Sequence, residues 1–280
     1  MPNVKIVTDS LADIPASILK ELDITTIPCV VRFGDHEYYD RVDLYPSEFY
    51  QKLRTSPVLP TTSQPAIGIF EDLYRKLAAT TDQILAIHTI ASLSGIYNAS
   101  RVAAENIKTA RIELIDSKQV TMSLGWLVIL AARAAKDGRT LDEIKQIVED
   151  TKTRVHIIAM LGTLEYAQRG GRLGKGKALV GTLLNVKPLL SVIDGEIMPV
   201  ENVRTQKRAL QRLVEIVLAS GPIQELAVIH AEAPDHARQL RELLAETFPE
   251  EHIVMSETGP VLGSHVGPGA VGIAWITGKY

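Results

Sequence analysis

Two polar residues that could act on a ligand lie far apart in this sequence. The first is Ser94, which follows the apolar run Ile84 to Ile87 within a segment of small residues. A short apolar run that ends in small polar residues is typical of a buried parallel strand, and open α/β sheets bind ligands at the carboxyl ends of such strands. Ser94 is therefore a candidate ligand contact, although serine in front of a helical pattern is also a common N-cap.

The second residue is His265, which lies between Gly263 and Gly267 in a glycine-rich segment. We expect this segment to be irregular rather than an apolar helix face, because its glycines would let the backbone and the imidazole approach a ligand closely. The alternative is a histidine that is retained for structural reasons.

Ser94, His265 and several aspartates together supply the residue types of a Ser-His-Asp triad. However, the sequence around Ser94 reads S-L-S-G and lacks the first glycine of the nucleophile-elbow pattern G-x-S-x-G. A stand-alone serine acyl hydrolase that uses Ser94 and His265 is therefore the alternative function rather than the leading one.

Two glycine-rich patterns resemble nucleotide-binding motifs, and both fail on context. Gly171 to Lys177 matches the start of a P-loop, but Ala178 stands where a hydroxyl would hold Mg²⁺, and the pattern follows a helix instead of a strand. Gly267 to Gly272 fits G-x-G-x-x-G but leads into a strand, so no helix N-terminus follows to receive a pyrophosphate. The seven histidines are scattered without metal-ligand spacing, so we expect no metal site.

A turn at Gly170-Gly171-Arg172 is followed by concentrated positive charge. Such a turn is either a solvated loop or a docking point for an anion or an acidic partner.

The composition restricts the class of protein. With 280 residues, 46% of them hydrophobic, the chain can bury a sizeable core and is long for one domain. A net charge of −3 argues against a nucleic-acid partner. The single cysteine, Cys29, lies in an apolar run and is expected to be a buried small hydrophobe, which suits a cytoplasmic protein. The longest apolar segment, Leu124 to Ala132, is too short to span a bilayer and indicates a buried core helix.

The elements that position these residues follow an α/β pattern. In the first half, apolar strands are expected at 4–7, 24–33, 84–87 and 111–115, with helical patterns between them, which indicates βαβ units in a largely parallel sheet. The second half has expected strands at 155–161, 226–230, 253–255 and 273–276, and a hairpin of 187–192 with 197–200, which together indicate a mixed sheet. We therefore predict two α/β domains, residues 1–154 and 155–280.

Short motifs run through nearly the whole chain in a fixed order. They are Thr8-Asp9-Ser10 with Asp13, Tyr39-Asp40, Thr62-Ser63-Gln64-Pro65, Leu93-Ser94-Gly95 with Tyr97, Ile115-Asp116-Ser117, Thr163-Leu164-Glu165-Tyr166 with Gly170-Gly171-Arg172, Asn185-Val186-Lys187-Pro188, Val203-Arg204, and Gly259 to Gly272. Together they resemble the DegV family, whose studied members are lipid-binding proteins, including the fatty-acid-binding subunit of bacterial fatty acid kinase.

The resemblance implies a long-chain fatty acid held between the two domains. It places the carboxylate near Thr62, Ser94 and His265, with Ser63, Gly95 and Gly267 in the loops of the lipid site. A carboxylate removed from water needs hydrogen-bond donors, and two hydroxyls with one imidazole N–H supply them without a buried countercharge.

The resemblance also implies a partner protein. Arg172 and Arg204 look like positions that dock a cytoplasmic fatty acid kinase catalytic subunit, with Asp40 in the same surface. The kinase would supply ATP and metal for phosphorylation of the fatty acid to acyl phosphate. This chain would then be a non-catalytic subunit with no cofactor of its own. Transient contact with a membrane would be compatible with this role. A third hypothesis, a small-molecule sensor whose ligand changes an oligomer interface, is supported by no particular residue.

Overall fold

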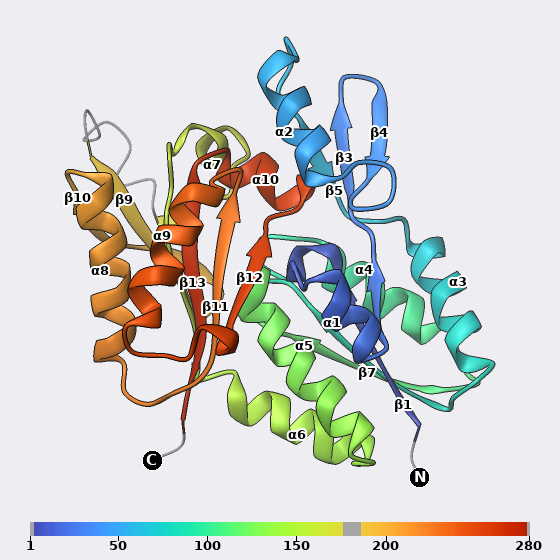
Figure 1. Ribbon diagram of the computed structural model, residues 1–280. Helices are drawn as coiled ribbons and strands as arrows, with labels where there is room; N and C mark the ends of the chain where they lie inside the picture. The colour runs from blue at the N-terminus through green and yellow to red at the C-terminus, as the bar shows by residue number, and fades with distance from the viewer. Residues whose placement is uncertain (1–2, 176–185, 279–280) are drawn as a thin grey trace.

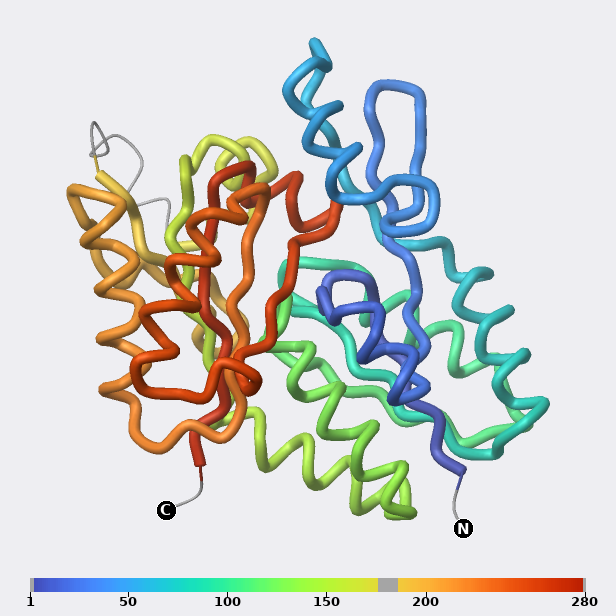
Figure 2. Tube along the Cα trace, viewed as in Figure 1, coloured from blue at the N-terminus to red at the C-terminus, as the bar shows by residue number. Residues whose placement is uncertain are grey.

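The computed structural model describes residues 3–175 and 186–278, arranged as two α/β halves that lie side by side (Figures 1 and 2). The strands are β1 Val4–Asp9, β2 Ile24–Ile27, β3 Val30–Phe33, β4 His36–Tyr39, β5 Thr61–Ser63, β6 Gln83–His88, β7 Arg111–Asp116, β8 Val155–Met160, β9 Lys187–Ile193, β10 Glu196–Val203, β11 Ile223–Ala231, β12 Ile253–Glu257 and β13 Ala270–Thr277. The helices are α1 Ala16–Glu21, α2 Pro46–Thr55, α3 Ile67–Ala78, α4 Ile96–Glu105, α5 Thr121–Lys136, α6 Leu141–Thr151, α7 Glu165–Arg169, α8 Gln206–Ala219, α9 Pro234–Ala245 and α10 Pro260–Val266, with short 3₁₀ turns at Ser10–Ala12 and Glu250–His252. Lys177, Ala178 and Asn185, which belong to the motifs above, lie outside the described residues.

The first half contains a parallel sheet of order β2-β1-β6-β7. Successive side chains of β6 point into two different hydrophobic cores. Leu85 and Ile87 pack on the side of α5 and α6, whereas Ile84 and Ala86 pack on the side of α3 and α4. Burial on both faces explains why the run is apolar throughout. The parallel sheet predicted for this half is confirmed.

The second half contains a mixed sheet of order β10-β9-β8-β13-β11-β12, in which β11 and β12 are parallel and the other neighbours are antiparallel. Helices α8 and α9 cover one face of this sheet. The mixed sheet and the predicted hairpin with its turn at Asp194 and Gly195 are confirmed, and both turn residues have the positive φ that such a two-residue turn requires.

A small antiparallel sheet of order β4-β3-β5 was not expected. The single strand predicted over 24–33 is wrong, because Pro28 has no N–H for a ladder bond and the chain leaves the parallel sheet after Ile27. β3 then pairs with β4 and β5, and Val31 lies opposite Thr62. Thr62 is therefore held in a strand.

The segment before the last strand is a helix rather than the irregular stretch that we predicted. Pro260 at the first turn begins α10, because its fixed φ suits a helix start and its missing N–H costs nothing there. Gly267 ends the helix with a φ of 68°, which a residue with a side chain rarely adopts. His265 thus lies in the last turn of α10.

Helix α5 joins the two halves. It is buried along most of its length, as predicted for 124–132, and it contacts both β1 and strands of the mixed sheet. Trp126 Nε1 donates a hydrogen bond of 3.1 Å to the Ala274 carbonyl. One hydrophobic core contains residues from both halves that pack around α5, so the halves are not separated by a break in the core. The domain boundary at Arg154 therefore stays a prediction. Within residues 3–175 and 186–278, no helix is both long and apolar enough to cross a bilayer.

Candidate functional site

A cavity of about 430 Å³ lies between the two halves. Its floor is the face of the mixed sheet opposite α8 and α9, and its other walls come from the loops after β1 and β6, from β5 and from α10. Most of the lining side chains are apolar, and the volume falls in the range of ligand pockets.

The polar residues of the two predicted segments meet at this cavity. Thr62, Ser94 and His265 all line it, and Thr62 Oγ1 lies 2.8 Å from His265 Nε2. They arrive from β5, from the loop between β6 and α4, and from α10. The arrangement therefore puts two hydroxyls and one imidazole at an otherwise apolar space.

His265 is a neutral imidazole at pH 7. Burial lowers its pKa to about 4, and the positive charge of Arg172 adds to the shift. Nδ1 is buried without a hydrogen-bond partner and packs against Gly170, where a Cβ would overlap the ring. A bare nitrogen lone pair is tolerated there better than an orphaned N–H. We therefore assign the proton to Nε2, which donates to Thr62 Oγ1 and leaves the Thr62 O–H free to donate into the cavity.

Ser94 contributes little to capping the helix that follows it. Its hydroxyl accepts a long bond of 3.4 Å from the Ile96 backbone N–H, and the capping residue of α4 is Gly95. The Gln64 side chain fills the space that a Cβ on Gly95 would occupy, so this glycine lets the Thr62 and Ser94 segments pack together. The hydroxyl proton of Ser94 remains available to a ligand.

The residues expected in the lipid-site loops differ in position. Ser63 and Gly95 line the cavity, whereas Gly267 does not. The Tyr166 ring occupies the space where a Gly267 Cβ would point, so Gly267 allows α10 to pack against α7.

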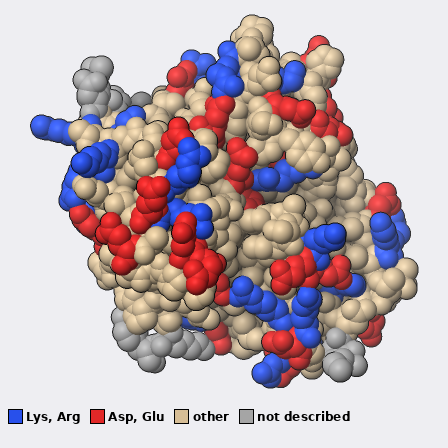
Figure 3. Space-filling model, in the orientation of Figure 1, with Lys and Arg blue, Asp and Glu red and all other residues tan. Residues whose placement is uncertain are grey.

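The residues expected to dock a partner also differ in their position relative to the cavity. Arg172 is exposed and lines the cavity, with Nε 3.4 Å from the Leu93 carbonyl and Nη1 2.8 Å from the Gly170 carbonyl. Arg204 is exposed just before α8, away from the cavity lining. Figure 3 shows acidic and basic side chains interspersed on the face in view.

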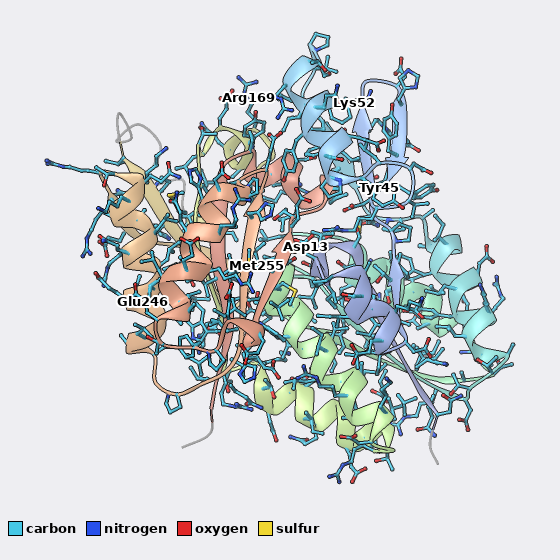
Figure 4. All side chains as sticks on the ribbon, viewed as in Figure 1. Asp13, Tyr45, Lys52, Arg169, Glu246 and Met255 are labelled. Carbon is cyan, nitrogen blue, oxygen red and sulfur yellow. The ribbon has the colours of Figure 1, made fainter. Side chains whose placement is uncertain are left out.

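Asp40 lies inside the protein, with an exposed fraction of 2%. Its Oδ2 accepts bonds from Ser10 Oγ at 3.0 Å and from the Val261 backbone N–H at 3.3 Å, and burial raises its pKa to about 7. Arg41 pairs at 3.0 Å with the neighbouring Asp13, which Figure 4 shows between the halves near β12. Asp40 thus braces the two halves and, contrary to the expected docking role, presents no surface to a partner.

Among the described residues, His265 does not form a Ser-His-Asp triad. Its Nε2 pairs with Thr62 instead of Ser94, and its Nδ1 has no hydrogen-bond partner, so no carboxylate orients the ring. An Asp-His-Ser arrangement does occur elsewhere: His88 Nδ1 lies 3.1 Å from Asp9 Oδ2, and His88 Nε2 lies 2.8 Å from Ser100 Oγ. These three residues are fully buried and none lines the cavity, so the network supports the core. Among the described residues, no group of three potential ligands is placed to hold a metal ion.

Sequence reasoning missed the contact between Gln64 and Gly95 and the sheet residues that line the cavity. Ile157 and Val192 are two of these residues. Both faces of β8 and β9 carry mostly apolar residues, so the sequence did not show which face borders the cavity.

Fold and cavity define an α/β protein with a parallel sheet, a mixed sheet and a small antiparallel sheet, and with a mostly apolar binding space between its two halves that has polar groups on its wall. The family model described as uncharacterised protein, DegV family, matches residues 3–278, and the chain belongs to this family.

Solved relatives share the whole fold. A structure described as fatty acid binding of a DegV family protein from Thermus thermophilus has 29% identity and a TM-score of 0.92, covering 98% of this chain and 99% of that one. DegV of Bacillus subtilis, described as a fatty acid binding protein, has 33% identity and a TM-score of 0.88, covering 99% and 100%. A stearic-acid-binding protein from Eubacterium ventriosum has 25% identity and a TM-score of 0.87, covering 99% and 98%.

Proposed function

We propose that this protein binds a long-chain fatty acid in the cavity, with the carboxylate beside Thr62, Ser94 and His265. The observation that carries the proposal is the Thr62–His265 pair at 2.8 Å on the wall of an otherwise mostly apolar space. The descriptions of the solved relatives as fatty acid binding proteins support the same ligand class.

The two ends of the ligand have different roles. Each buried CH₂ contributes about 0.8 kcal/mol, so ~15 methylenes contribute on the order of 10 kcal/mol and dominate affinity. The carboxylate accepts from the hydroxyls of Thr62 and Ser94, which fixes its orientation. Arg172 is exposed to solvent, so it forms no buried ion pair with the carboxylate and contributes little to affinity.

The further role of the site is to present the carboxylate to a cytoplasmic kinase. A carboxylate oxygen attacks the γ-phosphorus of ATP held by the kinase, and the bond to ADP breaks, which yields an acyl phosphate and ADP. Arg172 borders both the cavity and solvent, and with the exposed Arg204 it would contact the kinase. This division of labour agrees with Ala178 standing after Lys177, where a P-loop would have the hydroxyl that holds Mg²⁺.

Native mass spectrometry of protein purified from a bacterial host tests the binding proposal. We expect a mass increment of one fatty acid that organic extraction removes and that palmitate or oleate restores. A protein that carries no lipid and takes up neither acid would refute the proposal.

A further inference from the structure

The small antiparallel sheet contacts helix α10 at two points. His265, in the last turn of α10, pairs with Thr62 of β5, and a second contact is made one helical turn earlier. There the Val261 backbone N–H donates a hydrogen bond of 3.3 Å to Oδ2 of Asp40, which directly follows β4. At ~1.5 Å per residue, the two contacts lie about 6 Å apart along the helix.

The same three strands carry both contacts. β3 pairs with β4 on one side and with β5 on the other, where Val31 lies opposite Thr62. The Asp40 backbone N–H continues the pairing by donating a bond of 2.9 Å to the Cys29 carbonyl. Asp40 and Thr62 are thus held at opposite edges of one hydrogen-bonded sheet, so the sheet fixes their separation.

A cluster of charged residues holds the chain that leads into α10. Arg41 has a φ of 61°, which a residue with a side chain seldom adopts and which persists where the surrounding contacts enforce it. Its guanidinium donates to Asp13 Oδ1 at 3.0 Å and to the Glu257 carbonyl. Asp13 Oδ1 also accepts a bond of 2.9 Å from the Gly259 backbone N–H. The corner at Asp40 and Arg41 therefore fixes both the approach to α10 and its first turn.

Two glycines let α10 pack closely against its neighbours. A Cβ on Gly259 would lie 2.8 Å from Asp40 Oδ1. A Cβ on Gly263 would lie 2.8 Å from side-chain atoms of Phe49 and Tyr50 in α2. The helix is thereby packed between α2 and α7 (Figure 1). Because α10 has only seven residues, it has little stability of its own, and its position depends on these contacts.

We propose that Asp40 is a positioning residue of the lipid site, which holds the first turn of α10 so that His265 stays within hydrogen-bonding reach of Thr62. This inference rests on the proposed function and assigns a further residue to the head-group end of the site. Asp40 acts through α10, because it is not among the residues that line the cavity. Without it the helix can shift, and His265 then no longer orients the Thr62 hydroxyl toward the carboxylate.

The experiment measures palmitate affinity, by displacement of a fluorescent fatty acid, in single and double variants. Asp40→Ala removes the acceptor for the Val261 N–H, so Kd should rise about tenfold, whereas Asp40→Asn keeps an acceptor oxygen and should stay near the wild type. In a His265→Gln background, Asp40→Ala should change Kd by less than about twofold, because a residue that acts through His265 has no further effect once the imidazole is absent.

Ser100→Ala is the matched control for a loss of stability. It also removes a buried hydrogen-bonding group, but Ser100 does not line the cavity and bonds His88 and Tyr74 instead of α10. Its thermal midpoint should fall while its Kd for palmitate stays unchanged. Asp40→Ser, whose shorter side chain withdraws the oxygen from the Val261 N–H, provides the same comparison if Asp40→Ala does not fold.

An unchanged Kd in Asp40→Ala would overturn the inference while leaving fatty acid binding intact. Equal rises in Kd with and without His265 would also overturn it, because Asp40 would then act independently of the imidazole. A matching rise in Ser100→Ala would do the same, since general destabilisation would be the cause. If the wild type binds no palmitate, the proposed function itself has failed.

Discussion

His265 Nε2 and Thr62 Oγ1 lie 2.8 Å apart although 203 residues separate them in the chain. One residue belongs to the small sheet beside the first half, and the other ends the helix before the last strand. The polar wall of the cavity therefore exists only when the two halves are held together. The Thr62 hydroxyl is oriented by His265, which comes from the other half.

Removing the Thr62 hydroxyl should weaken fatty acid binding. Thr62→Val keeps the shape of the side chain but deletes a hydrogen bond to a charged group, which contributes about 1.5–3 kcal/mol, so Kd should rise roughly tenfold or more. Displacement of a fluorescent fatty acid measures this change. Thr62→Ser retains the hydroxyl and should stay near the wild type, and equal affinity in Thr62→Val would contradict the assignment.

Ser94→Ala should weaken fatty acid binding while leaving the stability of the protein nearly unchanged. The Ser94 hydroxyl makes only a long bond to Ile96, so its removal should change the free energy of unfolding by less than about 0.5 kcal/mol. Fatty acid affinity should fall roughly tenfold, because a carboxylate hydrogen bond is lost. Thermal unfolding and lipid titration of the same preparation test both statements. A large loss of stability would show that Ser94 is mainly a structural residue.

The lowered pKa of His265 predicts a pH dependence of folding. Between pH 6.5 and about 4 the unfolded chain binds a proton at this residue that the folded protein excludes, so its contribution to stability is present above pH 6.5 and is lost on acidification. Asp40, whose pKa is raised to about 7, acts in the opposite direction, since its contribution is lost as pH rises from 3.8 to 7.

The two effects are separated by comparing variants. His265→Gln cannot titrate, so the difference in unfolding free energy between wild type and His265→Gln should shrink as pH falls from 6.5 to 4. Asp40→Asn should become more stable relative to the wild type as pH rises toward 7. Urea unfolding at a series of pH values measures both differences, and parallel curves would refute the burial argument.

Arg172→Ala should spare lipid binding and impair use of the lipid by the kinase. The side chain is exposed and its two hydrogen bonds are to backbone carbonyls at the surface, so its loss should leave the thermal midpoint nearly unchanged. Arg169→Ala is the matched control on α7, because Arg169 forms an ion pair of 2.8 Å with Glu165 of its own helix. Acyl phosphate formation with ATP and the kinase subunit should fall for Arg172→Ala alone, and an equal fall in both variants would exclude a specific role.

Ser100→Ala should destabilise the protein more than Ser94→Ala does. Ser100 Oγ is bonded to His88 Nε2 at 2.8 Å and to the Tyr74 hydroxyl at 2.6 Å, and all three side chains are fully buried. Its removal leaves buried polar groups without their partner, which costs about 1–3 kcal/mol. Chemical denaturation measures the loss, and an unchanged midpoint would show that the network relaxes.

The sequence by itself determined most of the local elements, although it indicated neither the break at Pro28 nor helix α10. Apolar runs such as Ile84 to Ile87, which end in polar residues, indicated buried parallel strands, because such strands are covered on both faces. Asp194-Gly195 indicated its hairpin, since positive φ is readily adopted there. The motifs around Thr62, Ser94 and His265 identified the residues that line one cavity.

Only the tertiary structure decided what those residues contact. Asp40 and Arg172 are both polar residues in motif segments, yet one braces the interior and the other borders solvent. Ile157 and Ile158 are adjacent and chemically identical, yet Ile157 lines the cavity and Ile158 packs against helices α8 and α9. Local pattern fixes the period of a strand, whereas burial, pKa and cavity depth depend on partners that are distant in the chain, and these are brought together only by packing.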